Sequence, residues 1–267
     1  MSDYLLGDRD PELDRLERQH ELWSESTCAL WERAHIVAGD TVADLGCGPG
    51  ATCLELAARV APGGRVLAID ASEKALARVR ERGRHAAAAV EPVHADLEAW
   101  SPDPGSLDSA FARWSFCFLS DPRRLLEATA RGLRSGGSLA VFDYARYDAF
   151  AFHPESEAQK TARRAVLRSW SATGGDLEVA ATLPGWGTSC SLATEWIDLE
   201  TRIARPGEPL WSWPRRFFEG FAPKLVSDGL LDDATAAALF ADWDALEQTP
   251  GAFVILPPML RLVLRKV

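Results

Sequence analysis

The sequence has no long apolar run that would indicate a membrane protein. No stretch of the 267 residues approaches the ~20 apolar residues that a helix needs to cross a bilayer. The first residues, Met-Ser-Asp-Tyr, also lack the basic and apolar regions of a signal peptide. These absences predict a cytoplasmic protein that does not span a membrane.

Cysteines in the spacing of a metal site are also missing. The chain has five cysteines, an odd number, at Cys28, Cys47, Cys53, Cys117 and Cys190. Structural zinc sites need ligand pairs separated by a few residues, repeated along the chain. We therefore interpret these cysteines as small buried residues and predict no metal site.

Positive charge is scarce. The chain has 29 Lys and Arg residues against 39 Asp and Glu residues, a net charge of −10. Proteins that bind nucleic acid hold its phosphates mainly with clustered Lys and Arg, so the charge argues against such a partner. No internal repeat, low-complexity tract or linker divides the chain, and we predict one domain over residues 1–267 of unspecified oligomeric state.

The sequence does contain a glycine-rich stretch between an apolar run and a helical pattern. Residues 42–50 read Val-Ala-Asp-Leu-Gly-Cys-Gly-Pro-Gly, and residues 51–60 follow with helical spacing. Glycines permit backbone dihedrals that other residues resist, and they let a ligand approach the main chain. The first turn of the helix would direct free N–H groups at that ligand. The stretch predicts a strand, a loop that cradles a nucleotide-like ligand, and a helix.

Two ligand classes use such a loop. Gly46, Gly48 and Ala51 loosely fit the dinucleotide fingerprint. Asp44, however, precedes the first glycine by two positions, and Gly50 comes one position earlier than that fingerprint requires. A carboxylate there disfavours a diphosphate but suits a ligand with an ammonium and a sulfonium. The stretch resembles the first motif of the class I S-adenosylmethionine-dependent methyltransferases; a nicotinamide-dependent oxidoreductase and a turn without ligand remain alternatives.

Four further apolar runs predict parallel strands at residues 65–70, 90–94, 106–112 and 138–144. Helices predicted at residues 72–82 and 121–133 alternate with them, which implies right-handed crossovers and a doubly wound sheet. Asp70 ends the second strand, 24 positions after Gly46, where nucleotide-binding folds place a carboxylate for the ribose hydroxyls. Two late strands, at 191–203 and 253–264, flank a largely helical segment.

The resemblance implies S-adenosylmethionine as cofactor and an α/β Rossmann-like fold of seven strands, the last antiparallel. It also implies a helical lid at residues 1–38, a cofactor-binding core at 40–145, and helical substrate-side insertions at 146–190 and 204–250. In that family, the loop after the third strand binds adenine, a role that Asp96 and Leu97 would have here. The cofactor-binding residues so predicted are Tyr4, Gln19, Asp44, Gly46, Cys47, Gly48, Gly50, Asp70, Ala71, Asp96, Leu97, Arg113 and Trp114.

Tryptophans concentrate in the later chain, where they could wall an apolar pocket or simply fill the core. Seven of the ten lie at Trp114, Trp170, Trp186, Trp196, Trp211, Trp213 and Trp243. Methyl transfer requires alignment, close approach and exclusion of water, and aromatic walls suit that task. We predict methylation of a hydroxyl on a small, apolar or aromatic acceptor in secondary metabolism. The motifs also resemble the ubiquinone and menaquinone methyltransferases, so C-methylation of a quinone-like ring is an alternative, as is a non-methylating cyclase or scaffold.

A base would assist the methylation of a hydroxyl, although many methyl transfers need none. His153 is the first choice, because histidine titrates near neutral pH and aromatic residues precede it. Tyr144 is the second choice, and Tyr147, Asp143 and His20 are further candidates.

Overall fold

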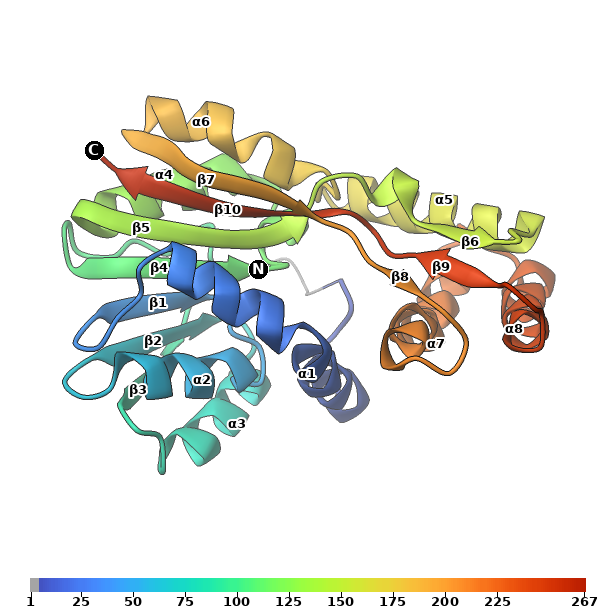
Figure 1. The fold of residues 1–267 in the computed structure, drawn as a ribbon, viewed down its shortest axis with the longest axis horizontal. Coiled ribbons are helices and arrows are strands. Elements are labelled where there is room, and N and C mark those ends of the chain that lie inside the picture. The colour runs from blue at the N-terminus through green and yellow to red at the C-terminus, as the bar shows by residue number, and fades with distance from the viewer. Residues whose placement is uncertain (1–4) are drawn as a thin grey trace.

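The computed structural model describes residues 5–267, and a seven-stranded sheet of order β3-β2-β1-β4-β5-β10-β7 forms its centre (Figure 1). The strands are β1 (Thr41–Leu45), β2 (Arg65–Asp70), β3 (Ala89–His94), β4 (Leu107–Arg113), β5 (Leu133–Tyr144), β7 (Leu192–Glu200) and β10 (Met259–Lys266). The first five pair in parallel, whereas β10 is antiparallel to both β5 and β7. The predicted doubly wound sheet with an antiparallel last strand is confirmed.

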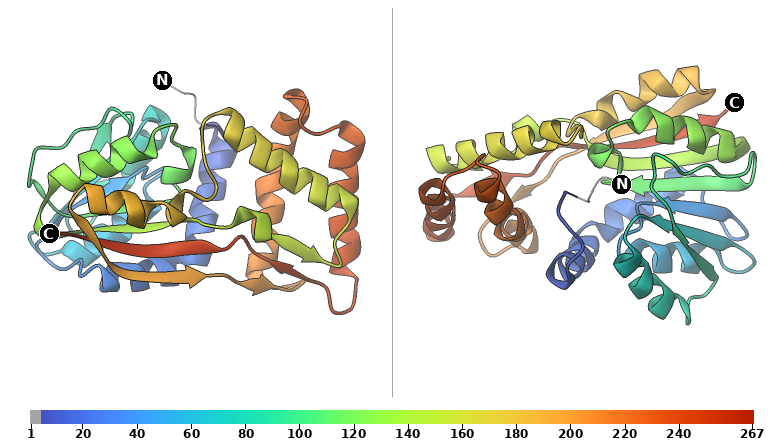
Figure 2. Two further views of the ribbon diagram at one scale, coloured as in Figure 1. Left: turned by 90° about the horizontal axis from the view of Figure 1, so that it is seen from above. Right: turned by 180° about the vertical axis from the view of Figure 1, so that it is seen from behind.

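Helices cover both faces of this sheet, so its central strands are largely apolar on both faces. On one face lie α1 (Asp10–Arg33), α2 (Ala51–Val60) and α3 (Glu73–Gly83), and on the other α4 (Pro122–Gly132) and α6 (Leu183–Ser189) (Figures 1 and 2). Parallel strands covered on both sides bury both rows of side chains. In β1, for example, Val42, Ala43 and Leu45 are all fully buried.

The alternation of strands and helices has one gap, between β3 and β4. Residues 95–106 form turns and irregular chain there instead of a helix. Pro102, Pro104 and Gly105 lie in this segment, and neither residue type favours a continuing helix. The chain therefore passes from β3 to β4 without a helix.

A second, three-stranded sheet was not predicted from the sequence. Its strands are β6 (Ala151–His153), β9 (Phe253–Ile255) and β8 (Ile203–Ala204), in the order β6-β9-β8 and all antiparallel. It lies with α5 (Glu157–Ala172), α7 (Ser212–Ser227) and α8 (Asp233–Glu247) on the right of Figure 1. Residues 5–267 also contain four short 3-10 helices: η1 (Phe116–Phe118), η2 (Tyr147–Ala149), η3 (Val179–Ala181) and η4 (Pro209–Trp211).

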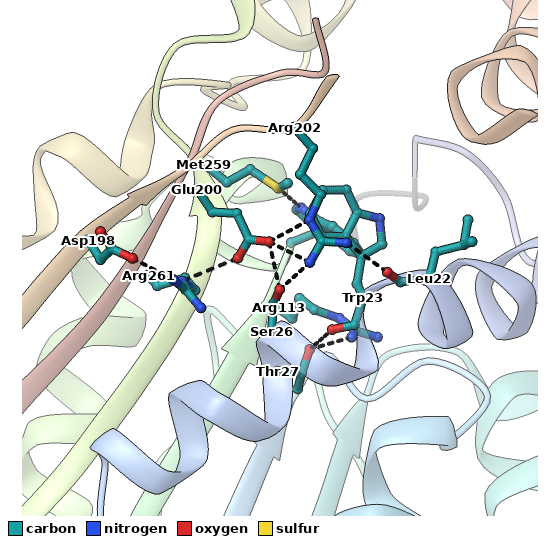
Figure 3. A network of polar contacts seen from close by, with 11 residues as sticks. Leu22, Trp23, Ser26, Thr27, Arg113, Asp198, Glu200, Arg202, Met259 and Arg261 are labelled. Atoms are coloured by element: carbon teal, nitrogen blue, oxygen red, sulfur yellow. Dashed lines mark hydrogen bonds and ion pairs between the residues drawn. The ribbon is translucent and has the colours of Figure 1, made fainter. Parts of the chain in front are cut away.

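The C-terminal half of α1 is joined to β7 and β10 by a buried polar network (Figure 3). Ser26 Oγ donates a hydrogen bond to Glu200 Oε1 at 2.6 Å, and Arg202 Nε donates to the same oxygen at 2.7 Å. Arg261 Nε lies 3.2 Å from Glu200 Oε2. The Arg202 guanidinium also lies 4.5 Å from the ring centre of Trp23. This half of α1 is thus fixed against the sheet.

The N-terminal half of α1 is held by ion pairs to α3. Arg78 Nη1 lies 2.7 Å from Asp14 Oδ1 and 2.8 Å from Glu17 Oε1. Arg82 Nη2 lies 2.6 Å from the same Glu17 oxygen. These contacts place α1 across the carboxyl ends of the strands.

No helix within residues 5–267 is both long enough and apolar enough to cross a membrane.

Candidate functional site

A cavity of about 500 Å³ lies at the carboxyl ends of the parallel strands, beside α1. Ligands of open α/β sheets bind at this edge. The strand order separates its lining into two parts. The polar end follows β1, β2 and β3 and contains Asp44, Gly46, Cys47, Gly48, Asp70, Ala71, Ser72, Asp96 and Leu97. The aromatic end follows β4 and β5 and contains Phe118, Tyr144, Tyr147, Phe150, Trp170, Trp213 and Phe217.

The three loop glycines have different reasons to be glycine. All adopt left-handed φ values: +75° at Gly46, +53° at Gly48 and +86° at Gly50. A Cβ on Gly46 would lie 2.5 Å from Ser115 Oγ, and one on Gly50 would lie 2.8 Å from Val79 Cγ2. A Cβ on Gly48 would meet nothing closer than 3.7 Å and would enter the cavity. Gly48 therefore leaves room for a ligand, whereas Gly50 does not line the cavity and packs against α3.

Asp70 ties the glycine loop to the end of β2. Its two carboxylate oxygens each accept one backbone hydrogen bond, from Gly48 N and from Ser72 N, both at 2.8 Å. Burial raises the pKa of Asp70, while these amides favour the ionised form. Each oxygen of an ionised carboxylate can accept a further hydrogen bond. The side chain can therefore bind ligand hydroxyls while holding the loop.

Two opposite charges lie near each other between β1 and β4. Asp44 is buried, and its Oδ2 accepts a hydrogen bond from Thr52 Oγ1 at 2.6 Å. Burial raises the pKa of Asp44 and lowers that of Arg113 to about 10, and their mutual attraction opposes both shifts. Arg113 donates to Thr27 Oγ1 at 2.8 Å and lies 3.1 Å from His20 Nδ1 (Figure 3 shows the Thr27 contact). Both charged groups line the cavity and can pair with a zwitterionic ligand.

Trp114 marks the boundary between the two ends. Its φ of +51° is left-handed, an uncommon value for a bulky residue. The indole N–H donates to Met259 Sδ at 2.9 Å. On either side, its ring lies near Tyr144 and Trp213, with centroid distances of 6.3 and 5.9 Å. The Trp114 ring thus lines the cavity between the polar and aromatic ends.

The phenols of the aromatic end stay neutral at physiological pH. Burial raises the pKa of Tyr144 well above its ordinary value and also raises that of Tyr147. Both side chains line the cavity. They can therefore exchange hydrogen bonds with a ligand hydroxyl, but they are weak proton acceptors.

His153, the first choice for a base, does not lie in the cavity. It is in β6, an exposed residue whose ring stacks on Phe253 with a centroid distance of 4.6 Å. Pairing of β6 with β9 turns it away from the site, so its position does not support the predicted catalytic role. Asp143 is also elsewhere: it is fully buried and accepts hydrogen bonds from Ser115 N and Tyr144 N. His20 lines the cavity, close to Arg113.

Most predicted cofactor contacts converge on the cavity. Gln19, Asp44, Gly46, Cys47, Gly48, Asp70, Ala71, Asp96, Leu97, Arg113 and Trp114 all line it. Tyr4 lies outside the described residues. Of the seven later tryptophans, Trp114, Trp170 and Trp213 line the cavity. Phe118 and Phe217, which also line the aromatic end, had no distinguishing signal in the sequence.

Within residues 5–267, no group of three or more His, Cys, Asp or Glu side chains could hold a metal ion.

Comparisons with known sequences find methyltransferases. Residues 42–137 match the family described as Methyltransferase domain. The chain is 39% identical over 113 residues to trans-aconitate 2-methyltransferase of Paracidovorax citrulli, which covers 42% of each protein. It is 32% identical over 130 residues to 2-phytyl-1,4-naphtoquinone methyltransferase of Nostoc punctiforme, which covers 48% of this chain and 55% of that protein. The chain spans about half the length of these curated relatives.

Similarity to solved structures extends over nearly the whole chain. The crystal structure of the [4+2]-cyclase SpnF superposes with a TM-score of 0.56 at 21% identity, and the match covers 91% of this chain and 80% of that one. At such identity the similarity shows the fold alone. It extends beyond residues 42–137 into the segments that wall the aromatic end.

Proposed function

We propose that this chain, which belongs to the class I S-adenosylmethionine-dependent methyltransferases, methylates a hydroxyl on a small, largely apolar or aromatic acceptor in secondary metabolism. The observation that carries this proposal is the division of one cavity into a polar end and an aromatic end. The polar end fits the cofactor, and the aromatic end fits the methyl acceptor. When bound, S-adenosylmethionine supplies an activated methyl group on a positively charged sulfur.

The polar end fits the cofactor group by group. Asp70 offers oxygens to the ribose hydroxyls, and the space above Gly48 admits the ligand to the backbone. Asp96 and Leu97 line the same end, where the adenine would bind. Asp44 and the Arg113 guanidinium suit the ammonium and carboxylate of the methionine part. We further propose that α1, which crosses this end, acts as the lid.

The aromatic end favours an apolar or aromatic acceptor. Trp170 and Phe217 come from α5 and α7, and their rings lie 6.2 Å apart between centroids. Planar ligands gain from such walls through both apolar burial and ring contacts. Tyr144 and Tyr147 add two neutral phenols that can orient a hydroxyl. Catalysis then depends on alignment and exclusion of water, with proton loss from an acceptor whose hydroxyl is itself acidic.

Two alternatives have specific support. C-methylation of a quinone-like ring is favoured by the similarity to the naphthoquinone methyltransferase. A non-methylating cyclase or scaffold is favoured by the fold similarity to the cyclase, because a fold does not fix a function. The product distinguishes them: methyl ether, ring-methylated quinol, or a product without S-adenosylhomocysteine formation.

Cofactor binding is the first test. Isothermal titration with S-adenosylmethionine and S-adenosylhomocysteine should give micromolar dissociation constants, whereas NADH should not bind. Gly48→Trp fills the cavity and should abolish binding. Gly105→Trp is the matched control, because Gly105 also has a left-handed φ of +69° but would place its Cβ in open space. Loss of binding in both variants, or in neither, would contradict the site.

The acceptor is then sought with the same protein. Phenols and reduced naphthoquinones are incubated with S-adenosylmethionine, and S-adenosylhomocysteine formation is followed by mass spectrometry. A methyl ether supports the proposal, and a ring-methylated product supports C-methylation. Cofactor binding without transfer to either compound class would favour the cyclase or scaffold.

A further inference from the structure

Gln19 connects α1 with α7 inside the cavity. Its side-chain oxygen accepts a hydrogen bond from Trp213 Nε1 at 2.9 Å and another from Arg15 Nη1 at 2.8 Å. Gln19 is 8% exposed and Trp213 is 6% exposed, and both line the cavity. A single amide group therefore links the helix across the polar end to a wall of the aromatic end.

The chemistry of the two donors fixes the orientation of this amide. An indole N–H and a guanidinium can donate hydrogen bonds but cannot accept them. The amide of Gln19 must therefore turn its oxygen toward both donors, and its NH2 group is directed elsewhere. Within residues 5–267, no hydrogen-bond acceptor binds this NH2 group. It is available to a ligand in the cavity.

Trp213 also has a fixed place among the aromatic rings. Its ring lies 5.9 Å from Trp114 and 5.2 Å from Trp23, measured between centroids. Trp114 in turn neighbours Tyr144. A change at the Trp213 indole therefore alters the wall that the methyl acceptor meets.

We infer that Gln19 is a positioning residue that couples cofactor binding to the wall of the aromatic end; the inference rests on the proposed function. Its NH2 group binds the carboxylate of the cofactor, while its oxygen holds the indole of Trp213. A carboxylate on the NH2 group polarises the amide and strengthens its oxygen as a hydrogen-bond acceptor. The bound cofactor thus strengthens the hydrogen bond that holds the Trp213 indole before the methyl acceptor arrives.

Fluorine NMR of protein labelled with 5-fluorotryptophan tests this coupling without a methyl acceptor. The Trp213 resonance is assigned by its loss in Trp213→Phe. S-adenosylhomocysteine should shift this resonance, whereas 5′-methylthioadenosine, which lacks the carboxylate, should shift it much less. The resonance of Trp196, which packs on Arg33 and Arg261 outside the cavity, serves as the internal control.

Two variants of Gln19 separate coupling from simple packing. In Gln19→Met, S-adenosylhomocysteine should still bind but leave the Trp213 resonance unmoved. Gln19→Glu keeps an oxygen for Trp213 but repels the ligand carboxylate, so S-adenosylhomocysteine should bind about tenfold more weakly or worse. The affinity for 5′-methylthioadenosine should change by less than about threefold, since no charged hydrogen bond is lost.

Several results would overturn the inference. One is an unchanged shift of the Trp213 resonance in Gln19→Met, and another is an equal loss of affinity for both ligands in Gln19→Glu. If wild-type protein binds 5′-methylthioadenosine but its Trp213 responds to both ligands alike, the carboxylate is not the link. If the wild type binds neither ligand, the proposed function itself fails, and the inference fails with it.

Discussion

Asp143→Asn should remove a pH dependence of folding that a single buried carboxyl creates. Asp143 lies at the end of β5, fully buried, and its Oδ2 accepts hydrogen bonds from Ser115 N at 3.1 Å and Cys117 N at 3.3 Å. Its Oδ1 accepts from Tyr144 N at 2.8 Å. Burial raises the pKa of Asp143 from 3.8 to about 6, and these amides only partly oppose the shift.

The sign and size of the effect follow from this pKa. Between pH 3.8 and about 6, the folded state keeps the proton on Asp143 and the unfolded state loses it. The free energy of unfolding therefore falls as pH rises through this range, by about 3 kcal/mol in total at about 1.36 kcal/mol per pKa unit. Between about pH 4.5 and pH 7.5, the same relation gives a loss of about 2 kcal/mol.

Urea denaturation of both proteins across this pH range measures the difference. Asparagine does not titrate in this range, so the variant lacks the pH dependence that Asp143 gives the wild type. The free energy of unfolding of the wild type minus that of the variant should therefore decrease by about 2 kcal/mol from about pH 4.5 to pH 7.5. The other carboxyls are the same in both proteins, so their contributions to the pH dependence cancel in the difference between the two free energies of unfolding.

Asp108→Asn is the control, with the opposite sign. Burial alone would raise the pKa of Asp108, but hydrogen bonds from the Thr41 amide and the Arg134 guanidinium lower it below its ordinary value. Its stabilising effect is present at neutral pH and is lost as pH falls, so this variant differs most from the wild type at high pH. Parallel pH profiles for wild type and Asp143→Asn would refute the reasoning, because they would mean that Asp143 has the same pKa folded and unfolded.

Two further predictions concern stability. Gly46→Ala should be at least about 1 kcal/mol more destabilising than Gly63→Ala in urea denaturation: both positions are left-handed, but only the first adds a clash with Ser115, and equal losses would contradict it. Glu200→Gln removes the charge at the centre of the buried network, and a loss of about 2 kcal/mol should lower Tm by about 4–8 °C. Glu127→Gln, at an exposed ion pair, should change Tm by less than half as much.

The fold of the cofactor half could be predicted because its signals are local. Each parallel strand is an apolar run long enough to recognise. Asp44 in β1 precedes Gly46 by two positions, and Asp70 at the end of β2 precedes the capping Ser72 by two positions. Parallel strands bring their carboxyl ends to one edge, so residues as distant as Asp44 and Asp96 were predicted to meet, and both line the cavity. The second sheet gave no such signal. Strands of two or three residues, such as Ile203–Ala204, are too short to show alternation, and their partners are distant in sequence.

The aromatic end was harder to predict for the same reason. His153 follows two phenylalanines in the sequence, which favoured an aromatic pocket around it. Its neighbour in space is instead Phe253, a partner 100 positions away that pairing of β6 with β9 supplies. Gln19 was predicted to contact the cofactor, but its hydrogen bond to Trp213 joins α1 to α7 across 194 positions. Contacts of this kind depend on how helices pack, which side-chain spacing within one helix does not determine.

The pairing of β8 with β9 has a consequence for how this chain can diversify. Ala204 pairs with Val254, so the segment between them, which includes α7 and α8, leaves and re-enters the fold at one point. A segment with adjacent ends can be exchanged or lengthened without moving the sheet that carries its ends. Transplanting residues 205–252 from a relative is thus a modular way to change what the aromatic end accepts while the glycine loop and Asp70 stay unchanged. Substitutions in this segment can thus change the aromatic end of the cavity while the residues of the glycine loop stay the same.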